Sequence, residues 1–313
     1  MNIVFYQHGS DATPWLAGMR ARLPQAQIRV WQPGDDAPAD YAMVWAPPYE
    51  LLAQREGLKG IMVLGAGVDA LLQQERARPG MLPVGVPIMR LEDNGMAQQM
   101  QEYALATALR YFRRLDEYQG LQQQGRWQPL PTRAHADFVI GVMGAGVLGK
   151  AVAQALAAQG FPVRCWSRSA KAIAGVDSFA GQDELPVFLQ GMQMVVNLLP
   201  NTPQTQGIVN HALLAQLNAQ AYVVNLARGA HVVEADLLAA LASGQVAAAA
   251  LDVFAQEPLA DAHPFWAHPR VSITPHTAAM TLQAPAMDAI AANILALEAG
   301  QPPSGLVDRA RGY

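Results

Sequence analysis

A glycine-rich loop between an apolar run and a helix-like run most constrains what this chain can fold into. The apolar run spans 138–143, the loop from Gly144 to Gly149 reads Gly-Ala-Gly-Val-Leu-Gly, and helical spacing continues to Gln159. In such a strand–loop–helix unit the glycines permit a tight turn, a close approach of the backbone to a pyrophosphate, and close packing of helix on strand. The helix N-terminus also attracts phosphate charge. We therefore predict a dinucleotide site here, rather than a turn that uses glycine for geometry alone. The residues expected to contact the dinucleotide are Gly144, Gly146, Val147, Leu148 and Gly149.

Short apolar runs alternate with helix-like stretches on both sides of this loop. From the loop onward the connections are short, which is typical of consecutive βα units in a parallel sheet. Before the loop, a shorter series includes the runs 3–6, 42–45 and 60–64. The strands expected in the later series are 138–143, 162–166, 194–199, 221–226, 247–251 and 271–274. We predict an α/β protein with two doubly wound lobes, Rossmann-like and flavodoxin-like, with parallel sheets and a cleft between the lobes.

The length of 313 residues suits two domains. A long helical pattern from Met96 to about Gln124 separates the two series and is expected to link the domains. The stretch from Gly80 to Asn94 is rich in glycine and proline and is expected to be an irregular connection. We predict a substrate-binding domain formed by 1–97 and 280–313 and a dinucleotide-binding Rossmann domain formed by 98–279.

Composition and charge exclude several classes of protein. A hydrophobic fraction of 51% provides for a large core, and the net charge of -4 supplies no basic field for nucleic acid or an anionic membrane surface. No segment is apolar over the length needed to cross a bilayer, and the N-terminus lacks the pattern of a signal peptide. The single cysteine, Cys165, excludes an internal disulfide and fits a reducing compartment. We expect a cytoplasmic protein with no nucleic-acid or membrane partner.

Most histidines of the chain lack the spacing of a metal site. We therefore expect no bound metal and interpret these side chains as ordinary surface or loop histidines. They are His8, His135, His211, His231, His263 and His268.

The turn after the strand at 162–166 indicates which nicotinamide dinucleotide binds. An NAD-preferring site places Asp or Glu at the end of this strand, about 20 residues after the loop, to bind the ribose hydroxyls. This chain has Ser167, Arg168 and then Lys171 there, so no acid repels a 2′-phosphate and a guanidinium can bind it. We predict that these three residues contact NADPH, with NADH as a weaker alternative cofactor. A solvated basic turn that binds nothing is the other interpretation.

Three polar residues suit the reduction of a keto acid. Arg228, Glu257 and His276 each come shortly after one of the last three expected strands, at the edge where parallel sheets bind ligands. An imidazolium can donate a proton to a carbonyl oxygen while the carbonyl carbon receives a hydride. A neighbouring carboxylate can support that imidazolium, and a guanidinium can bind a substrate carboxylate. Taken singly, each residue has a structural alternative: a surface arginine, a loop-closing carboxylate and a helix cap.

Several motifs together resemble those of the D-isomer-specific 2-hydroxyacid dehydrogenases, and the similarity covers essentially the whole chain. They are the glycine loop, Asn225-Leu226-Ala227-Arg228-Gly229, Asp252-Val253-Phe254 with Glu257-Pro258-Leu259, and Thr274-Pro275-His276. Other segments are similar to a bacterial branch of this family that reduces glyoxylate and hydroxypyruvate. These segments are Trp45-Ala46-Pro47-Pro48, Leu64 to Asp69, Arg90 to Asp93 and Val307 to Tyr313. Ala46 stands where a bulkier polar residue, often histidine, is expected in this branch.

The resemblance implies roles for individual residues. Arg228 and His276 are catalytic by this resemblance, Glu257 is paired with His276, and Asp252 contacts the nicotinamide carboxamide. An aspartate at a strand end can equally bind local backbone amides, so this alternative for Asp252 stays open. The other implied cofactor contacts are Leu199, Pro200, Asn201, Thr202 and Ala227, and the implied substrate contacts are Trp45, Gly65, Ala66, Gly67 and Arg228. The family also implies a homodimer.

We therefore expect an NADPH-dependent 2-hydroxyacid dehydrogenase that works as a reductase, converting glyoxylate to glycolate and hydroxypyruvate to glycerate. Formate dehydrogenases of the same scaffold resemble a pattern with glutamine in place of Glu257, which disfavours that activity. Two alternatives stay open: a dehydrogenase for a different 2-hydroxy acid, and a corepressor-like interaction protein that senses a dinucleotide. The sensor differs from the enzyme in binding NADPH without turnover.

Overall fold

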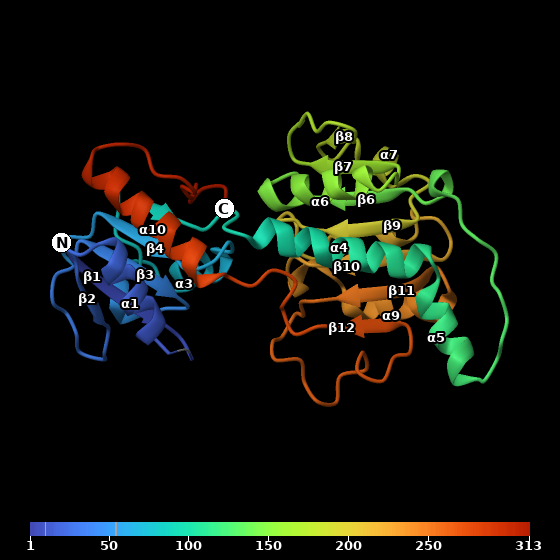
Figure 1. Ribbon diagram of the computed structural model, residues 1–313, viewed down its shortest axis with the longest axis horizontal. Coiled ribbons are helices and arrows are strands. Elements are labelled where there is room, and N and C mark those ends of the chain that lie inside the picture. The colour runs from blue at the N-terminus through green and yellow to red at the C-terminus, as the bar shows by residue number, and fades with distance from the viewer. Residues whose placement is uncertain (10, 54) are drawn as a thin grey trace. The chain divides into compact units, whose positions relative to one another are not determined.

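The computed structural model describes residues 1–9, 11–53 and 55–313 (Figure 1). The chain forms two compact units: the first comprises Met1–Gly95 and Thr281–Tyr313, and the second comprises Met96–Met280. The expected domain limits differ from these bounds by one or two residues. Each unit contains its own parallel sheet, so the predicted α/β fold class is confirmed.

The first unit contains a five-stranded parallel sheet in the order β2-β1-β3-β4-β5, which is the order of flavodoxin-like sheets. The strands are β1 (Asn2–Gln7), β2 (Gln27–Val30), β3 (Tyr41–Trp45), β4 (Gly60–Val63) and β5 (Ile88–Met89). The helices are α1 (Thr13–Arg22), α2 (Tyr49–Leu52), α3 (Asp69–Ala77) and α10 (Gln283–Glu298). The C-terminal helix α10 belongs to this unit and packs closely on α1, where a Cβ on Gly18 would lie 2.3 Å from the sulfur of Met287.

The expectation of an irregular connection over Gly80–Asn94 is wrong only at strand β5, and the rest of this segment forms turns and bends without regular structure. Ile88 and Met89 are buried and pair in parallel with Ile61 and Met62 of β4. A strand of two residues is too short to show alternation in a sequence, and the glycines and prolines around it are typical of loops.

The second unit contains a seven-stranded parallel sheet in the order β12-β11-β10-β9-β6-β7-β8. The strands are β6 (Ile140–Met143), β7 (Val163–Ser167), β8 (Asp177–Ala180), β9 (Met194–Asn197), β10 (Ala221–Asn225), β11 (Val246–Leu251) and β12 (Val271–Ile273). Counted from β6, the strands follow the 3-2-1-4-5-6 order of dinucleotide-binding folds, and β12 extends one edge. The order reverses between β6 and β9, which is where such folds bind their ligand.

Helices cover both faces of this second sheet. They are α4 (Met96–Phe112), α5 (Leu115–Gln123), α6 (Val147–Ala158), α7 (Leu185–Leu189), α8 (His211–Leu214) and α9 (Glu234–Ser243), with short 3₁₀ turns at His135–Asp137 and Gly229–His231. Helix α4 crosses the near face of the sheet in Figure 1. In the part of the chain that the structure describes, no helix is long and apolar enough to cross a membrane.

The strands of the second sheet supply two hydrophobic cores. In β6, Val142 belongs to the core under α4 and α6, whereas Met143 belongs to the core under α7, α8 and α9. In β9, Val196 and Val195 divide in the same way. Because successive side chains of a strand point to opposite faces, a strand that is apolar without interruption fills both cores at once. The central strands were predictable from the sequence for this reason.

The helix expected from Met96 to about Gln124 is in fact two helices, α4 and α5. Arg114, at the junction, has a φ of 58°, in the left-handed region, which ends the first helix. Its guanidinium forms two hydrogen bonds of 2.8 Å with Glu117 and one of 3.0 Å with the carbonyl oxygen of Pro131. Helical spacing of apolar residues continues through the junction, so periodicity alone did not reveal the break.

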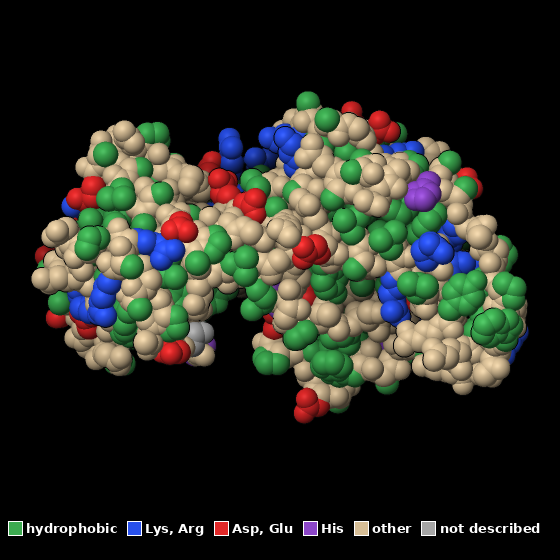
Figure 2. Space-filling view, viewed as in Figure 1, with side chains coloured by type: hydrophobic (Ala, Val, Ile, Leu, Met, Phe, Trp, Pro, Cys, Tyr) green, Lys and Arg blue, Asp and Glu red, His purple; other side chains and the backbone are tan. Residues whose placement is uncertain are grey.

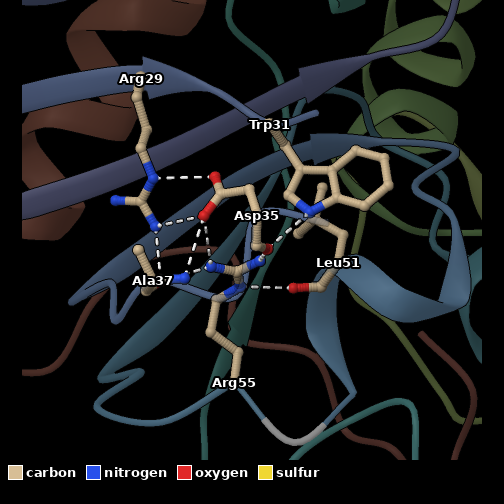
Figure 3. A network of polar contacts seen from close by, with 6 residues as sticks. All are labelled: Arg29, Trp31, Asp35, Ala37, Leu51 and Arg55. Carbon is tan, nitrogen blue, oxygen red and sulfur yellow. Dashed lines mark hydrogen bonds and ion pairs between the residues drawn. The ribbon is translucent and has the colours of Figure 1, made fainter. Parts of the chain in front are cut away.

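A buried arginine closes the loop between β2 and β3 in the first unit (Figure 3). The Arg55 side chain is 2% exposed, and its guanidinium donates to the carbonyl oxygens of Leu51, Ala37 and Asp35. The carboxylate of Asp35 lies 3.5 Å from Arg55 and 2.9 Å from Arg29. The hydrogen bond from Arg29 is the main cause that lowers the pKa of Asp35, and desolvation opposes it. This network ties α2 to the loop that precedes β3.

Candidate active site

Glu257 and His276 form a hydrogen-bonded pair at the carboxyl edge of the second sheet, in the loops after β11 and β12. The Nδ1 atom of His276 is 2.8 Å from Oε2 of Glu257. The other carboxylate oxygen, Oε1, accepts a hydrogen bond of 2.9 Å from the backbone nitrogen of Phe254. The side chains are 37% exposed for Glu257 and 46% exposed for His276, so both are accessible. A carboxylate that holds Nδ1–H leaves Nε2 as the ring nitrogen that can exchange a proton with a bound molecule.

Asp252 holds the loop that carries His276. Its carboxylate accepts hydrogen bonds from the hydroxyl of Thr274 at 2.6 Å and from the backbone nitrogens of Thr277 and Ala278 at 2.8 and 3.0 Å. Its backbone oxygen accepts the N–H of His276 at 2.8 Å. The sequence left two interpretations of Asp252 open, a contact with the nicotinamide carboxamide and hydrogen bonds with local backbone amides. The hydrogen bonds in the structure are of the second kind. A contact of Asp252 with the nicotinamide stays a prediction.

Two residues that support this loop were not predicted from the sequence. The hydroxyl of Thr274 donates to Asp252, so it accepts the hydrogen bond of 2.7 Å that joins it to the hydroxyl of Tyr103. Burial raises the pKa of Tyr103, which keeps this hydroxyl protonated as a donor. Tyr103 stands on α4, 171 positions before Thr274. In the sequence, the helical spacing of Tyr103 indicated a core position and nothing more. No local pattern could identify a hydrogen-bond partner so far away in the chain.

Arg228 lies in the loop after β10, directly beside the segment that holds Glu257. A Cβ atom on Gly229 would lie 1.7 Å from the carbonyl carbon of Phe254, so only glycine permits this contact between the two backbones. The backbone nitrogen of Phe254 in turn donates to Glu257. The Arg228 guanidinium donates to the carbonyl oxygen of Ala227 at 2.6 Å. The structure therefore brings the arginine loop next to the loop that carries the acidic partner of the histidine.

The glycine loop between β6 and α6 has the geometry of a phosphate-binding turn. Gly144 has a φ of 109°, and a Cβ there would lie 2.6 Å from the carbonyl oxygen of Leu198. A Cβ on Gly149 would lie 1.8 Å from the carbonyl oxygen of Gly144, so a side chain would push the helix away from the loop. At Gly146, the residue before α6, a Cβ would meet nothing within 4 Å. Open space beside the N-terminus of a helix fits the pyrophosphate of a dinucleotide.

The turn predicted to bind a 2′-phosphate follows β7, the strand next to β6. Ser167 ends this strand and donates its hydroxyl to the carbonyl oxygen of Ser169 at 2.8 Å. Arg168 and Lys171 are exposed in the turn. Two basic side chains therefore stand at the edge of the sheet where the glycine loop lies.

The segment Leu199–Thr202 follows β9, on the other side of the point where the strand order reverses. The hydroxyl of Thr205 donates to the carbonyl oxygen of Pro200 at 2.7 Å and accepts the backbone N–H of Thr202 at 2.9 Å. Leu199 and Thr202 are buried, each 7% exposed. These contacts give the segment a defined shape next to the glycine loop.

In the first unit, the residues predicted to contact substrate lie at the carboxyl ends of β3 and β4. Trp45 ends β3 and is 39% exposed. Its ring lies against Gly65, where a Cβ would be 2.4 Å from a ring carbon. Ala66 and Gly67 are partly exposed and precede α3, whose N-terminus carries the positive end of the helix dipole. Ala46, the departure from the family pattern, has a φ of 46°.

The expectation for one histidine is wrong. His231 is 0% exposed, and its Nδ1 atom lies 2.8 Å from the side-chain nitrogen of Asn197. Its burial was not visible in the sequence because it depends on a partner 34 positions away. Among the described residues, no group of three or more His, Cys, Asp or Glu side chains is arranged to hold a metal ion.

A dinucleotide-binding sheet with an acid-paired histidine at its ligand edge defines a nicotinamide-dependent dehydrogenase. The model of the D-isomer specific 2-hydroxyacid dehydrogenase family, NAD binding domain, matches residues 105–278. The chain belongs to this family, and the resemblance predicted from the motifs is confirmed.

Named relatives are similar to the chain over its full length. The glyoxylate/hydroxypyruvate reductase A of Serratia proteamaculans is 66% identical and that of Yersinia enterocolitica 63% identical, each over 313 residues and 100% of both chains. A D-isomer specific 2-hydroxyacid dehydrogenase from Xanthobacter autotrophicus Py2, solved with NADPH and MES, has a TM-score of 0.93 at 41% identity, covering 100% of this chain and 99% of that chain. The NADPH-dependent glyoxylate/hydroxypyruvate reductase of Sinorhizobium meliloti, solved with NADP and sulfate, has a TM-score of 0.91 at 34% identity with the same coverage.

Proposed function

We propose that this chain is an NADPH-dependent 2-hydroxyacid dehydrogenase that reduces glyoxylate to glycolate and hydroxypyruvate to glycerate. The observation that carries the proposal is the 2.8 Å hydrogen bond between His276 and Glu257 at the ligand edge of a dinucleotide-binding sheet. The names of the relatives at 66% and 63% identity support the choice of substrates. The proposed catalytic residues are Arg228, Glu257 and His276.

His276 is the proposed proton donor. Glu257 holds the Nδ1 hydrogen and keeps the ring oriented, so that Nε2 is presented to the substrate. From an imidazolium, Nε2 passes its proton to the carbonyl oxygen of the keto acid. When bound, the nicotinamide supplies the hydride that the carbonyl carbon receives. The oxygen gains the proton as the carbon gains the hydride, and a 2-hydroxy acid results.

Arg228 is the proposed partner of the substrate carboxylate. A guanidinium can bind a carboxylate through two parallel N–H bonds, which fixes the orientation of the keto acid as well as its charge. In the first unit, the proposed substrate-binding residues are Trp45 and the backbone of Gly65, Ala66 and Gly67.

The proposed cofactor is NADPH, with NADH as a weaker substitute. Arg168 and Lys171 supply positive charge for the 2′-phosphate, and Ser167 supplies a hydroxyl. The relatives from X. autotrophicus and S. meliloti were solved with NADPH and NADP, which supports this choice. The other proposed cofactor contacts are Gly144, Gly146, Val147, Leu148, Gly149, Leu199, Pro200, Asn201, Thr202, Ala227 and Asp252.

Initial rates with a panel of 2-keto acids, each with NADPH and with NADH, test this proposal. We expect the highest kcat/KM with NADPH and either glyoxylate or hydroxypyruvate, and lower values with pyruvate and longer keto acids. Folded protein that binds NADPH and reduces no keto acid would favour a dinucleotide sensor. A clear preference for a longer keto acid would assign the chain to a different dehydrogenase.

We also propose that the chain forms a homodimer through α5 and the segment 124–134 that follows it. Trp127 is 100% exposed, and Leu115 and Tyr118 on α5 are 52% and 37% exposed. Figure 2 shows hydrophobic side chains at the surface over this part of the second unit. The backbone nitrogen of Leu130 donates to the hydroxyl of Tyr118 at 2.9 Å, which holds the segment against the helix. Large exposed apolar side chains on an ordered segment are typical of an interface.

The proposed location is the cytoplasm, on the chemistry of the single cysteine. Cys165 is the one cysteine of the sequence and is buried, so the chain forms no internal disulfide, which fits a reducing compartment. Fractionation of cells that express the chain, with a periplasmic and a cytoplasmic marker enzyme, tests the location.

A further inference from the structure

Three buried polar side chains lie next to the Arg228 loop and take no part in the chemistry proposed above. Asn197 ends β9, Asn225 ends β10, and His231 lies in the 3₁₀ turn that follows Arg228; each of the three is 0% exposed. Asn197 and Asn225 are directly paired across the two neighbouring strands. Burying polar groups costs free energy unless their hydrogen bonds are satisfied, so the arrangement of the cluster needs a physical reason.

The backbone determines how both amides are oriented. Oδ1 of Asn225 accepts the N–H of Ala227 at 3.3 Å, and its Nδ2 donates to the carbonyl oxygen of Arg228 at 2.9 Å. Oδ1 of Asn197 accepts the backbone N–H two residues later, so its Nδ2 is the donor. This Nδ2 donates to Oδ1 of Asn225 at 2.9 Å and to Nδ1 of His231 at 2.8 Å. Nδ1 of His231 is therefore an acceptor, which makes the ring neutral with its proton on Nε2.

The cluster holds the backbone of Arg228 from two directions. The carbonyl oxygen of Arg228 accepts hydrogen bonds from Nδ2 of Asn225 at 2.9 Å and from the backbone nitrogen of His231 at 3.2 Å. Ala227, whose carbonyl oxygen accepts from the Arg228 guanidinium, is itself bound to Asn225. One amide thus fixes both ends of the dipeptide that carries the guanidinium. A guanidinium that forms two parallel bonds with a carboxylate tolerates little displacement.

We propose that Asn225 is a positioning residue for the carboxylate-binding Arg228, and that Asn197 and His231 orient its amide. This inference rests on the role proposed for Arg228. The order of donors and acceptors is directional: His231 accepts from Asn197, Asn197 donates to Asn225, and Asn225 donates to Arg228. A substitution that replaces the Nδ2 donor of Asn225 with an acceptor therefore displaces Arg228 without itself contacting the substrate.

Steady-state kinetics of Asn225→Asp, alone and combined with Arg228→Ala, test the inference. Aspartate keeps the shape of the side chain and the acceptor for Ala227, but it presents an oxygen to the carbonyl oxygen of Arg228. We expect KM for glyoxylate to rise about tenfold or more, since a bond is lost and a repulsion replaces it. Kd for NADPH should stay close to the wild-type value. Added to Arg228→Ala, Asn225→Asp should raise KM no further, because it acts through the missing arginine.

Asn218→Asp is the matched control. The Asn218 side chain also donates to a backbone carbonyl oxygen, that of Gly191 at 3.1 Å, but Asn218 is exposed and lies in the loop between α8 and β10. Its variant loses the same kind of bond, and its KM for glyoxylate should equal that of the wild type. Melting curves of all the variants show that KM is compared between folded proteins.

The outcomes separate this inference from the proposed function. An Arg228→Ala enzyme with unchanged KM overturns the arginine clamp itself. If Arg228→Ala raises KM but folded Asn225→Asp does not, or if the two effects add in full, the positioning role alone is overturned. If Asn225→Asp does not fold, the neutral Asn225→Ser variant enters the same cycle. The nitrogen NMR shifts of His231 in the wild type give an independent reading, and a proton found on Nδ1 contradicts the donor order.

Discussion

At the scale of single residues, His276 combines an unusual backbone with a side chain held at one nitrogen. Its φ of 57° lies in the left-handed region, which costs roughly 1–3 kcal/mol for a residue other than glycine. Asp252 accepts hydrogen bonds from the hydroxyl of Thr274 before the histidine and from the backbone nitrogens of Thr277 and Ala278 after it, and these bonds maintain this conformation. A substitution at this position therefore changes two things, the proton donor and the fit of the backbone, and a test must separate them.

His276→Asn makes this separation, because asparagine tolerates the left-handed region better than other non-glycine residues. The variant keeps the backbone and removes the proton donor. We expect kcat with NADPH and glyoxylate to fall about 10²–10⁴-fold. Kd for NADPH, measured by fluorescence, serves as the control and should change little. A kcat near that of the wild type means that another group donates the proton.

The role proposed for Arg168 affects binding of NADPH but not of NADH, because only NADPH carries the 2′-phosphate. Arg168→Ala removes the guanidinium proposed to bind the 2′-phosphate, a charge-assisted contact worth roughly 1.5–3 kcal/mol. We expect KM for NADPH to rise about 10- to 100-fold while KM for NADH changes little. NADH kinetics of the same variant are the internal control. Equal losses with both cofactors contradict the assignment.

At the scale of elements, the connection between β2 and β3 depends on the buried Arg55. Arg55→Met leaves three carbonyl oxygens without their charged donor in a nearly inaccessible site. We expect the free energy of unfolding to fall by roughly 3 kcal/mol, measured by urea denaturation. The control is Arg311→Met, which removes an ion pair with Asp308 whose arginine is 62% exposed and should cost less than about 1 kcal/mol. Equal losses in the free energy of unfolding for the two variants would mean that the burial of Arg55 adds nothing to stability.

The same network makes part of the stability depend on pH. Because the hydrogen bond from Arg29 lowers the pKa of Asp35 in the folded chain, the carboxylate stabilises the fold at pH values above its unfolded pKa of about 3.9. This contribution is lost as the pH falls through the lower, folded pKa. Asp35→Asn should therefore be less stable than the wild type at neutral pH, and the difference should shrink in acid. Urea denaturation between neutral and acidic pH measures it, with the exposed Asp36→Asn as control. A difference that stays constant contradicts the linkage.

At the scale of the whole molecule, the proposed dimer depends on the segment after α5. Trp127→Ser removes the most exposed large side chain of the proposed interface, and we expect the dimer to dissociate at protein concentrations where the wild type stays dimeric. Sedimentation or light scattering over a concentration series measures this. Trp266→Ser is the matched control, since Trp266 is also exposed, at 53%, but lies on another loop of the unit. If the wild type is monomeric at every concentration measured, the proposed dimer is wrong.

The central strands and the residues that follow them were predictable because their signals are local. An apolar run buried on both faces and a glycine loop before a helix are read within about ten residues, and each implies its geometry. The carboxyl ends of parallel strands meet at one edge, so Glu257 and His276 could be expected near each other although 19 positions separate them. The edge strand β8 escaped prediction because its four residues are half-buried or exposed and show no apolar run. The break between α4 and α5 left the helical spacing intact.

What the sequence determined by itself is the order of βα units, the dinucleotide loop and the identity of the polar residues at the sheet edge. Only the tertiary structure decided which polar residues are held in place by hydrogen bonds and which partners form those bonds. Tyr103 reaches Thr274, Asn197 pairs with Asn225, and His231 is buried beside them, through contacts between segments far apart in the chain. The physical reason is that periodicity and turn chemistry act over a few residues, whereas the burial and hydrogen-bond partner of a polar side chain depend on where the rest of the chain packs.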